Sequence, residues 1–289
     1  MVETHMAGLR RMLDLRGGIS AVRLSNPTIA NIVFWYVNIL SFQSSTDRIP
    51  SSMFIAAVDH PFPTIDLEIP ISRPPWYEDA LCRLDPRFYV DFLSCGVEPA
   101  YAEIMMNIRL LAKCYQMAAD CSSAEEYQSV LTFLCSTLQR LISLPIPVMD
   151  LDNLEAMYVT QACRHALIVH VFAQWSGHQP DPALMVSNAR HDLQTTCRTL
   201  MNLGSKNPLL LWLMAVGGVG AAGTPERKWF VGHMAILVSD FGISTWLELR
   251  DALKRIIWHE FQDEATHSVL WEEIALILDS NVKTTESTG

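Results

Sequence analysis

The most specific chemical pattern in the chain is Gly218-x-Gly220-x-x-Gly223, which has the spacing of a dinucleotide-binding fingerprint. Such glycines bind a pyrophosphate only where they leave a β-strand and open a helix. The preceding apolar run, 208–216, starts at a proline that is typical of a first helical position. Asp240 lies near the distance expected of a ribose-binding acid, but an acidic residue is common there by chance. The pattern therefore predicts close helix–helix packing and a helix end, and not a nucleotide site.

A second candidate is the row His259, Asp263 and His267, spaced at i, i+4 and i+8. Both residue types bind zinc. From the first to the third, a helix rises about 12 Å at ~1.5 Å per residue, so one ion cannot reach all three. A two-ligand site at His259 and Asp263 is an open alternative, but a polar face turned to solvent is the favoured interpretation.

The remaining candidate groups point away from catalysis. His165 and His170 stand five apart in an apolar segment, which is typical of core or interface histidines. The sequence has no HExxH or nucleophile-elbow motif. It also lacks the DDxxD-type carboxylate cluster with which a helical terpene cyclase would bind magnesium and diphosphate. We therefore expect no catalytic residue, no metal ligand and no cofactor.

Tryptophans are concentrated in the last third of the chain, at Trp212, Trp229, Trp246, Trp258 and Trp271. On amphipathic helices such rings usually fill the core. Apolar walls with a few polar groups are also typical of ligand pockets. Core packing is the favoured interpretation, and an apolar ligand pocket lined by the first four is the alternative.

The elements that position these residues are all expected to be helices. Several starts are marked by a polar residue followed by proline, as at Asn207-Pro208, and by capping boxes such as Thr245-x-x-Glu248. Glycines such as Gly17 and Gly18 mark stops. The resulting all-α fold has about ten helices. The segments expected to be helical are 2–16, 28–43, 86–95, 99–119, 124–142, 152–175, 183–203, 209–222, 226–241, 245–260 and 264–279.

Residues 1–279 are expected to form a single large helical domain. The one obvious break is 44–76, where six prolines exclude a long helix. We expect an irregular excursion over the domain there, because the helices before it are too few to form a core of their own; a linker between two domains is the alternative. Residues 280–289 are expected to be a disordered tail.

Composition excludes several classes of function. The 21 basic and 31 acidic residues give a net charge of −10, and no basic run is longer than a pair such as Arg10-Arg11, so direct nucleic-acid binding is not expected. The uncharged segment 207–225 is too short and too rich in glycine to span a membrane. Seven widely spaced cysteines without a CxxC motif indicate free thiols in a reducing compartment.

Two separated signatures resemble the regulatory, or middle homology, domain of fungal zinc-cluster transcription factors. The first is the row His5-x-x-Gly8-Leu9, Leu13 and Arg16-Gly17-Gly18. The second comprises Trp212, Gly217-Gly218, Glu226-Arg227, Trp229-Phe230, Trp246, Leu253, Trp258 and Leu270-Trp271. Between them, 44–180 is similar only in its helical character.

The resemblance implies a fungal transcription-regulatory domain in the nucleus, in a regulated pathway such as secondary metabolism. It implies protein partners, among them a full-length zinc-cluster regulator or a second copy, and responsiveness to a small ligand. Gly17, Gly18, Gly217, Gly218, Arg227 and Trp229 would then define the fold. The family's six-cysteine zinc cluster is not in this sequence, so we expect no DNA-binding module of its own. A helical small-molecule-binding protein or enzyme acting on an apolar metabolite is the alternative.

Overall fold

The computed structural model describes residues 8, 11–26, 33, 74–120, 124–144, 153–175, 183–260 and 262–286. Every regular element in these ranges is a helix, which confirms the all-α class. Most of the proline-rich segment 44–76, and the expected helix 28–43 apart from Val33, lie outside the described residues.

The helices follow the sequence signals closely in the middle of the chain. Their bounds are α2 Gly18–Ser25, α4 Tyr77–Cys82, α5 Arg87–Ser94, α6 Pro99–Asp120, α7 Ala124–Ser143, α8 Leu154–Trp175, α9 Ala183–Asn202, α10 Leu209–Gly220, α11 Glu226–Asp240, α12 Trp246–Lys254 and α13 Gln262–Glu286. The expected capping box opens α12: the Thr245 side chain accepts the Glu248 N–H, and the Glu248 carboxylate accepts the Thr245 N–H.

Four features differ from the expectation. Gly17 and Gly18 have φ of +82° and +86°, so the chain turns there as expected. No loop follows this turn, because α2 begins at Gly18 itself. The short helix α4 was not foreseen. α12 ends at Lys254, earlier than the expected end at 260, and α13 continues to Glu286, past the expected boundary at 279.

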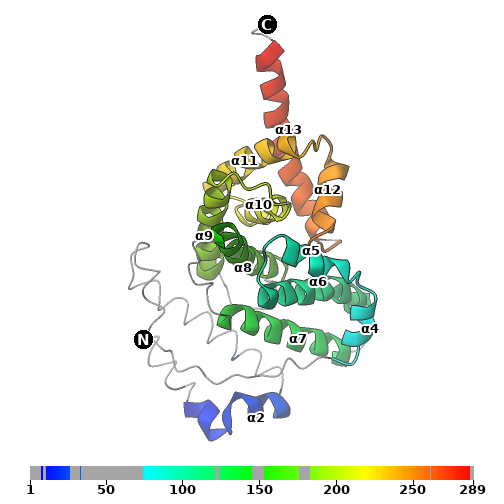
Figure 1. Ribbon diagram of the computed structural model, residues 1–289. Coiled ribbons are helices and arrows are strands. Elements are labelled where there is room, and N and C mark those ends of the chain that lie inside the picture. The colour runs from blue at the N-terminus through cyan, green and yellow to red at the C-terminus, as the bar shows by residue number, and fades with distance from the viewer. Residues whose placement is uncertain are drawn as a thin grey trace.

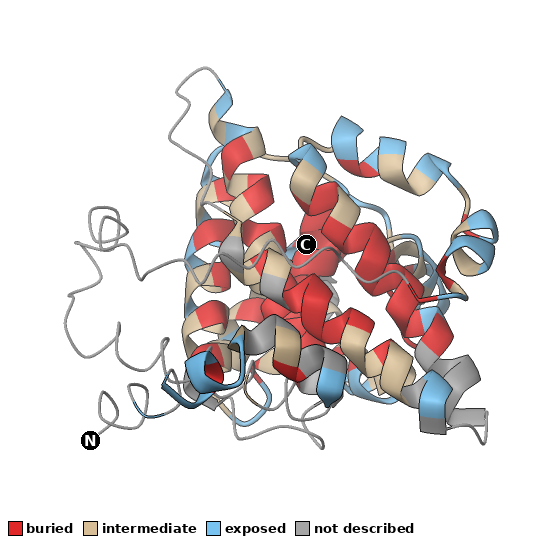
Figure 2. Cartoon of the chain, turned by 90° about the horizontal axis from the view of Figure 1, so that it is seen from below, coloured by how far each residue is buried: buried red, intermediate tan, exposed pale blue. Residues whose placement is uncertain are grey.

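The central element is α10, which carries no charged residue and is buried from Leu209 to Gly218. A helix that is apolar all round must be surrounded by protein. It packs on α8, α9, α11, α12 and α13, as Figure 1 shows. Figure 2 shows the buried residues on the inward sides of the helices and the exposed ones at the rim. One apolar core thus extends from Tyr77 to Ile274.

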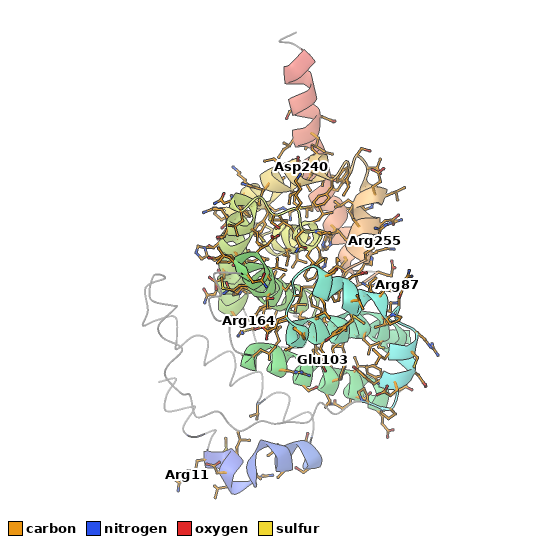
Figure 3. The ribbon with its side chains drawn as sticks, viewed as in Figure 1. Arg11, Arg87, Glu103, Arg164, Asp240 and Arg255 are labelled. Atoms are coloured by element: carbon orange, nitrogen blue, oxygen red, sulfur yellow. The ribbon has the colours of Figure 1, made fainter. Side chains whose placement is uncertain are left out.

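The pair α6 and α7 adjoins this body through α8. Arg164 of α8 donates hydrogen bonds to the carbonyl oxygens of Ile142 and Leu144 at the end of α7. Arg140 of α7 forms a two-bond ion pair with Glu103 of α6. Figure 3 labels Arg164 and Glu103 at this junction. No helix within the described ranges is long and apolar enough to cross a membrane.

Candidate functional site: the buried turn between α12 and α13

The segment 255–260, here called the 255–260 turn, joins α12 to α13 and receives polar side chains from three helices. Arg109 of α6 donates to the Ile256 carbonyl oxygen. The Trp212 indole of α10 donates to the Ile257 carbonyl oxygen at 3.1 Å. The Asp263 carboxylate of α13 accepts the His259 N–H at 2.7 Å. Side chains remote in sequence therefore end α12 early, although the sequence itself has no proline or glycine there.

Arg109 is a buried cation at the junction of α5, α6 and the turn. Its guanidinium carbon lies 3.6 Å from the centre of the Phe88 ring. Burial lowers the Arg109 pKa to about 10, and the charge of Asp85 partly opposes this shift. The side chain therefore remains protonated at neutral pH. A buried charge is costly unless it is hydrogen-bonded, so its bond to Ile256 is an anchor on which the turn depends.

The expected solvent-facing row of His259, Asp263 and His267 is wrong, because all three side chains are buried. α13 begins at Gln262, so His259 belongs to the turn and not to the same helix. On α13, Asp263 and His267 continue the stripe of Leu270 and Ile274, at intervals of four, three and four residues, and this stripe packs into the core. The positions of Leu270 and Ile274 were the sequence signal that could have identified this burial.

A third buried histidine, His170 of α8, interacts electrostatically with this group. Burial lowers the pKa of His170 to about 4, and Asp263 opposes the shift. Burial also lowers the pKa values of His259 and His267, again against Asp263. The three rings are therefore neutral at pH 7. The Nδ1 atom of His267 lies 2.9 Å from the Asp263 carbonyl oxygen, which requires the proton of the neutral ring to be on Nδ1.

The backbone and side chains of this group form a hydrogen-bonded polar cluster. Within the ranges that the structure describes, no group of three or more His, Cys, Asp and Glu side chains is placed to hold a metal ion. The hydrogen bond that the His259 N–H donates to the Asp263 carboxylate fixes the main chain of the turn. His165 is half-buried, whereas His170 is enclosed beside Trp212, with ring centres 5.9 Å apart.

Three of the four tryptophans proposed for a pocket contact the 255–260 turn or belong to it. The rings of Trp246 and Trp258 lie 6.4 Å apart, and the Trp258 ring lies 5.3 Å from His267. Trp212 reaches the turn through its bond to Ile257. Trp229 makes its contacts elsewhere, with its ring 4.3 Å from that of His233. The structure therefore does not place all four rings around one site.

The glycine fingerprint lies at the end of a helix, since α10 continues to Gly220. A β-carbon on Gly217 would lie 2.3 Å from the Phe230 ring, and one on Gly220 would lie 2.3 Å from a Val169 methyl group. Arg227 of α11 donates to the Gly218 carbonyl oxygen and pairs with Glu273 of α13 at 2.8 Å. These contacts explain the glycines as packing positions, and the helix before them removes the context that a nucleotide site needs.

A further arginine at this junction was not foreseen from the sequence. Arg190 of α9 donates to the Gly220 carbonyl oxygen at 3.1 Å. The last carbonyl groups of a helix lack intrahelical partners and carry partial negative charge, so cations stabilise them. Arg190 and Arg227 together provide the positive charge that stabilises the last carbonyl groups of α10.

Of the comparisons with known proteins, the one with models of protein families gives a match. No curated protein and no solved structure matches the chain. The family model of the fungal specific transcription factor domain matches residues 2–275, which include the whole core, the 255–260 turn and the glycine junction. The chain therefore belongs to the family of the fungal specific transcription factor domain and has a role in transcription regulation.

Proposed function

We propose that the chain is a ligand- or partner-responsive regulatory domain of a fungal zinc-cluster type regulator, without catalysis of its own. The responsive element is α12 with the 255–260 turn. The observation that carries this proposal is the attachment of the turn by hydrogen bonds from Arg109, Trp212 and Asp263 to three of its main-chain groups.

A few polar anchors suit a regulatory element for an energetic reason. A hydrogen bond contributes on the order of 1 kcal/mol net, and about 1.5–3 kcal/mol where one partner is charged. The loss of one or two such bonds is within the range that a ligand or partner can offset. A binding partner that favours the released turn would then shift the population between two packings of α12.

The charge of the chain supports action through protein contacts. A net charge of −10 opposes the approach of phosphate groups. We propose that this domain does not contact DNA or a membrane itself, and that a full-length zinc-cluster regulator or a second copy is its partner. Its place of action is then the nucleus.

The test is a reporter assay with the whole chain fused to a sequence-specific DNA-binding module from an unrelated protein. We expect the fusion to change reporter transcription relative to the DNA-binding module alone. Arg109→Met, which removes the charged anchor of the turn, should change that output further. The matched control is Arg140→Met, which removes only a half-exposed ion pair with Glu103.

Equal protein levels of the fusions, measured by immunoblotting, are needed to interpret the assay. A fusion that behaves as the DNA-binding module alone contradicts the regulatory role. Equal effects of Arg109→Met and Arg140→Met contradict the assignment of the 255–260 turn as the responsive element.

A small-molecule-binding function is the second candidate, and one observation favours it. The indole N–H of the buried Trp258 has no hydrogen-bond partner among the described residues. Beside it lie the Trp246 ring and the Lys254 ammonium, the latter 5.8 Å from the Trp258 ring centre. An apolar metabolite with one hydrogen-bond acceptor would fit these groups. Native mass spectrometry of the purified chain should then reveal a retained compound that Trp258→Phe loses and Trp229→Phe keeps.

A further inference from the structure

The outward face of α13 carries a stripe that the core does not cover. Val269 and Leu276 are 52% and 71% exposed and stand seven residues apart. Glu272 and Asp279, also exposed, follow each of them by three residues. These intervals place all four on one face of the helix. The opposite stripe, from Asp263 to Ile274, faces the core and fixes the orientation of the helix.

Figure 1 shows that the C-terminal half of α13 projects beyond the helical body. Single exposed apolar residues are normal on a protein surface. Two of them one heptad apart on a projecting helix form a ridge that a second helix can cover. The acidic residues on the same ridge require a partner that is apolar and basic.

The chain has a surface with these properties in its helical segment 11–15 and the residue after it. Met12 and Leu15 are 60% and 80% exposed, three residues apart. Arg11 and Arg16, both exposed, flank them, and the exposed Asp14 lies between the two arginines in the sequence, which leaves a net positive charge. Pairing of α13 with another α13 would instead bring Glu272 and Asp279 of the two helices together, where like charges repel.

The two surfaces cannot meet within one molecule in the described arrangement. Segment 11–15 and the end of α13 lie at opposite ends of the body in Figure 1, and Figure 3 labels Arg11 at the end far from α13. A contact between them therefore needs two molecules.

We propose that the outer face of α13 binds the Arg11–Arg16 surface of a second copy of this chain. Because the two surfaces differ, the contact is head-to-tail, and further copies extend it into a ring or a chain. The ion pairs lie at the rim of the contact, so salt should weaken the association.

The test is sedimentation velocity of the full chain over a range of concentrations and at two salt concentrations. We expect self-association that Leu276→Glu weakens by about tenfold or more. Leu203→Glu, at an exposed apolar residue after α9, is the matched control and should leave the association unchanged. Circular dichroism of each variant verifies that the fold is retained.

A charge-exchange experiment identifies the occupant. The double variant Glu272→Lys with Asp279→Lys, and the double variant Arg11→Glu with Arg16→Glu, should each fail to associate alone. Mixing the two should restore association with 1:1 stoichiometry. The α13 face of the first variant is then basic and matches the acidic segment of the second, while the reverse contact keeps its wild-type charges. A monomer at all concentrations overturns the proposal. The proposal is also overturned if the α13 variant no longer associates but the arginine variant associates as the wild type does.

Discussion

The end of α10 and the 255–260 turn lie on neighbouring parts of the same core but are held in different ways. At the end of α10, Gly217 and Gly220 bring helices so close that a β-carbon would overlap Phe230 or Val169. At the turn, three hydrogen bonds from Arg109, Trp212 and Asp263 fix the main chain. The first region allows no change in side-chain volume, whereas the second depends on a few polar bonds.

This difference separates a scaffold from an element that can respond. Close-packed interiors transmit strain and do not deform gradually, so the junction at α10 keeps α8, α11 and α13 in fixed positions. We propose that a turn held by discrete hydrogen bonds can open locally while the rest of the core stays packed. We therefore assign the proposed regulatory response to the turn and not to the glycine junction.

The largest expected effect is at the scaffold. Gly217→Val adds carbon atoms where the first would already lie 2.3 Å from the Phe230 ring. We expect a loss of about 3 kcal/mol or more in the free energy of unfolding, measured by urea denaturation. Gly232→Ala is the matched control: this helical glycine of α11 has no atom within 4 Å of an added β-carbon, and alanine should stabilise by up to about 1 kcal/mol. A tolerated Gly217→Val would show that the junction is not tightly packed.

The next effect is a dependence on pH that originates at the buried histidines His170, His259 and His267. His170 has a lowered pKa of about 4 in the folded chain and an ordinary value of 6.5. The unfolded chain therefore binds the proton first, and stability is lost as the pH falls from about 6.5 towards 4. The full loss from His170 is about 3 kcal/mol. His259 and His267, whose pKa values are also lowered, add to it in the same direction.

Denaturation at pH values between 4 and 7 measures this effect. His170→Phe should flatten the profile, and His191→Gln, at an exposed residue of α9, should leave it as in the wild type. An unchanged slope in His170→Phe would show that His170 does not cause the dependence on pH.

Removal of the charged anchor should cost less than either of these. Arg109→Met leaves the Ile256 carbonyl oxygen without its donor and loses the contact with Phe88. We expect a loss of about 2 kcal/mol in the free energy of unfolding, and faster proteolysis within 246–260. Arg140→Met should cost less than about 1 kcal/mol, since its ion pair is half-exposed. Equal losses in the two variants would show that Arg109 is no special anchor.

The smallest effect concerns the start of α12. Thr245→Ala removes the side-chain half of the capping box and should cost about 1 kcal/mol, with α12 fraying before the turn opens. Thr199→Ala, inside α9, should be neutral or slightly stabilising because alanine favours helix interiors. Thermal unfolding followed by circular dichroism distinguishes the two. A neutral Thr245→Ala would mean that tertiary contacts alone hold α12.

Helix starts and the central position of α10 were predictable, since capping residues, prolines and an uncharged apolar run act locally. The end of α12 was not, because side chains from α6 and α10 determine it. The burial of Asp263 and His267 was missed for a related reason. Their residue types suggested solvent, whereas the stripe shared with Leu270 and Ile274 placed them in the core.

The packing role of the glycines followed from rejecting the nucleotide fingerprint, and Arg227 was among the residues that the family resemblance implied to define the fold. The bond from Arg190 to the Gly220 carbonyl oxygen was not foreseen, since thirty residues separate the two. The hypothesis of a pocket lined by four tryptophans grouped Trp229 with the others, but its ring lies beside that of His233.

Hydrogen exchange of the whole chain, resolved by mass spectrometry, tests the central claim most directly. The 255–260 turn and α12 should exchange through a local opening that leaves α10 protected, and Arg109→Met should accelerate exchange in 246–260 while α10 keeps its wild-type protection. If 246–260 and 209–220 instead exchange together at one rate in both proteins, they open only by global unfolding. That result would contradict a separately releasable turn.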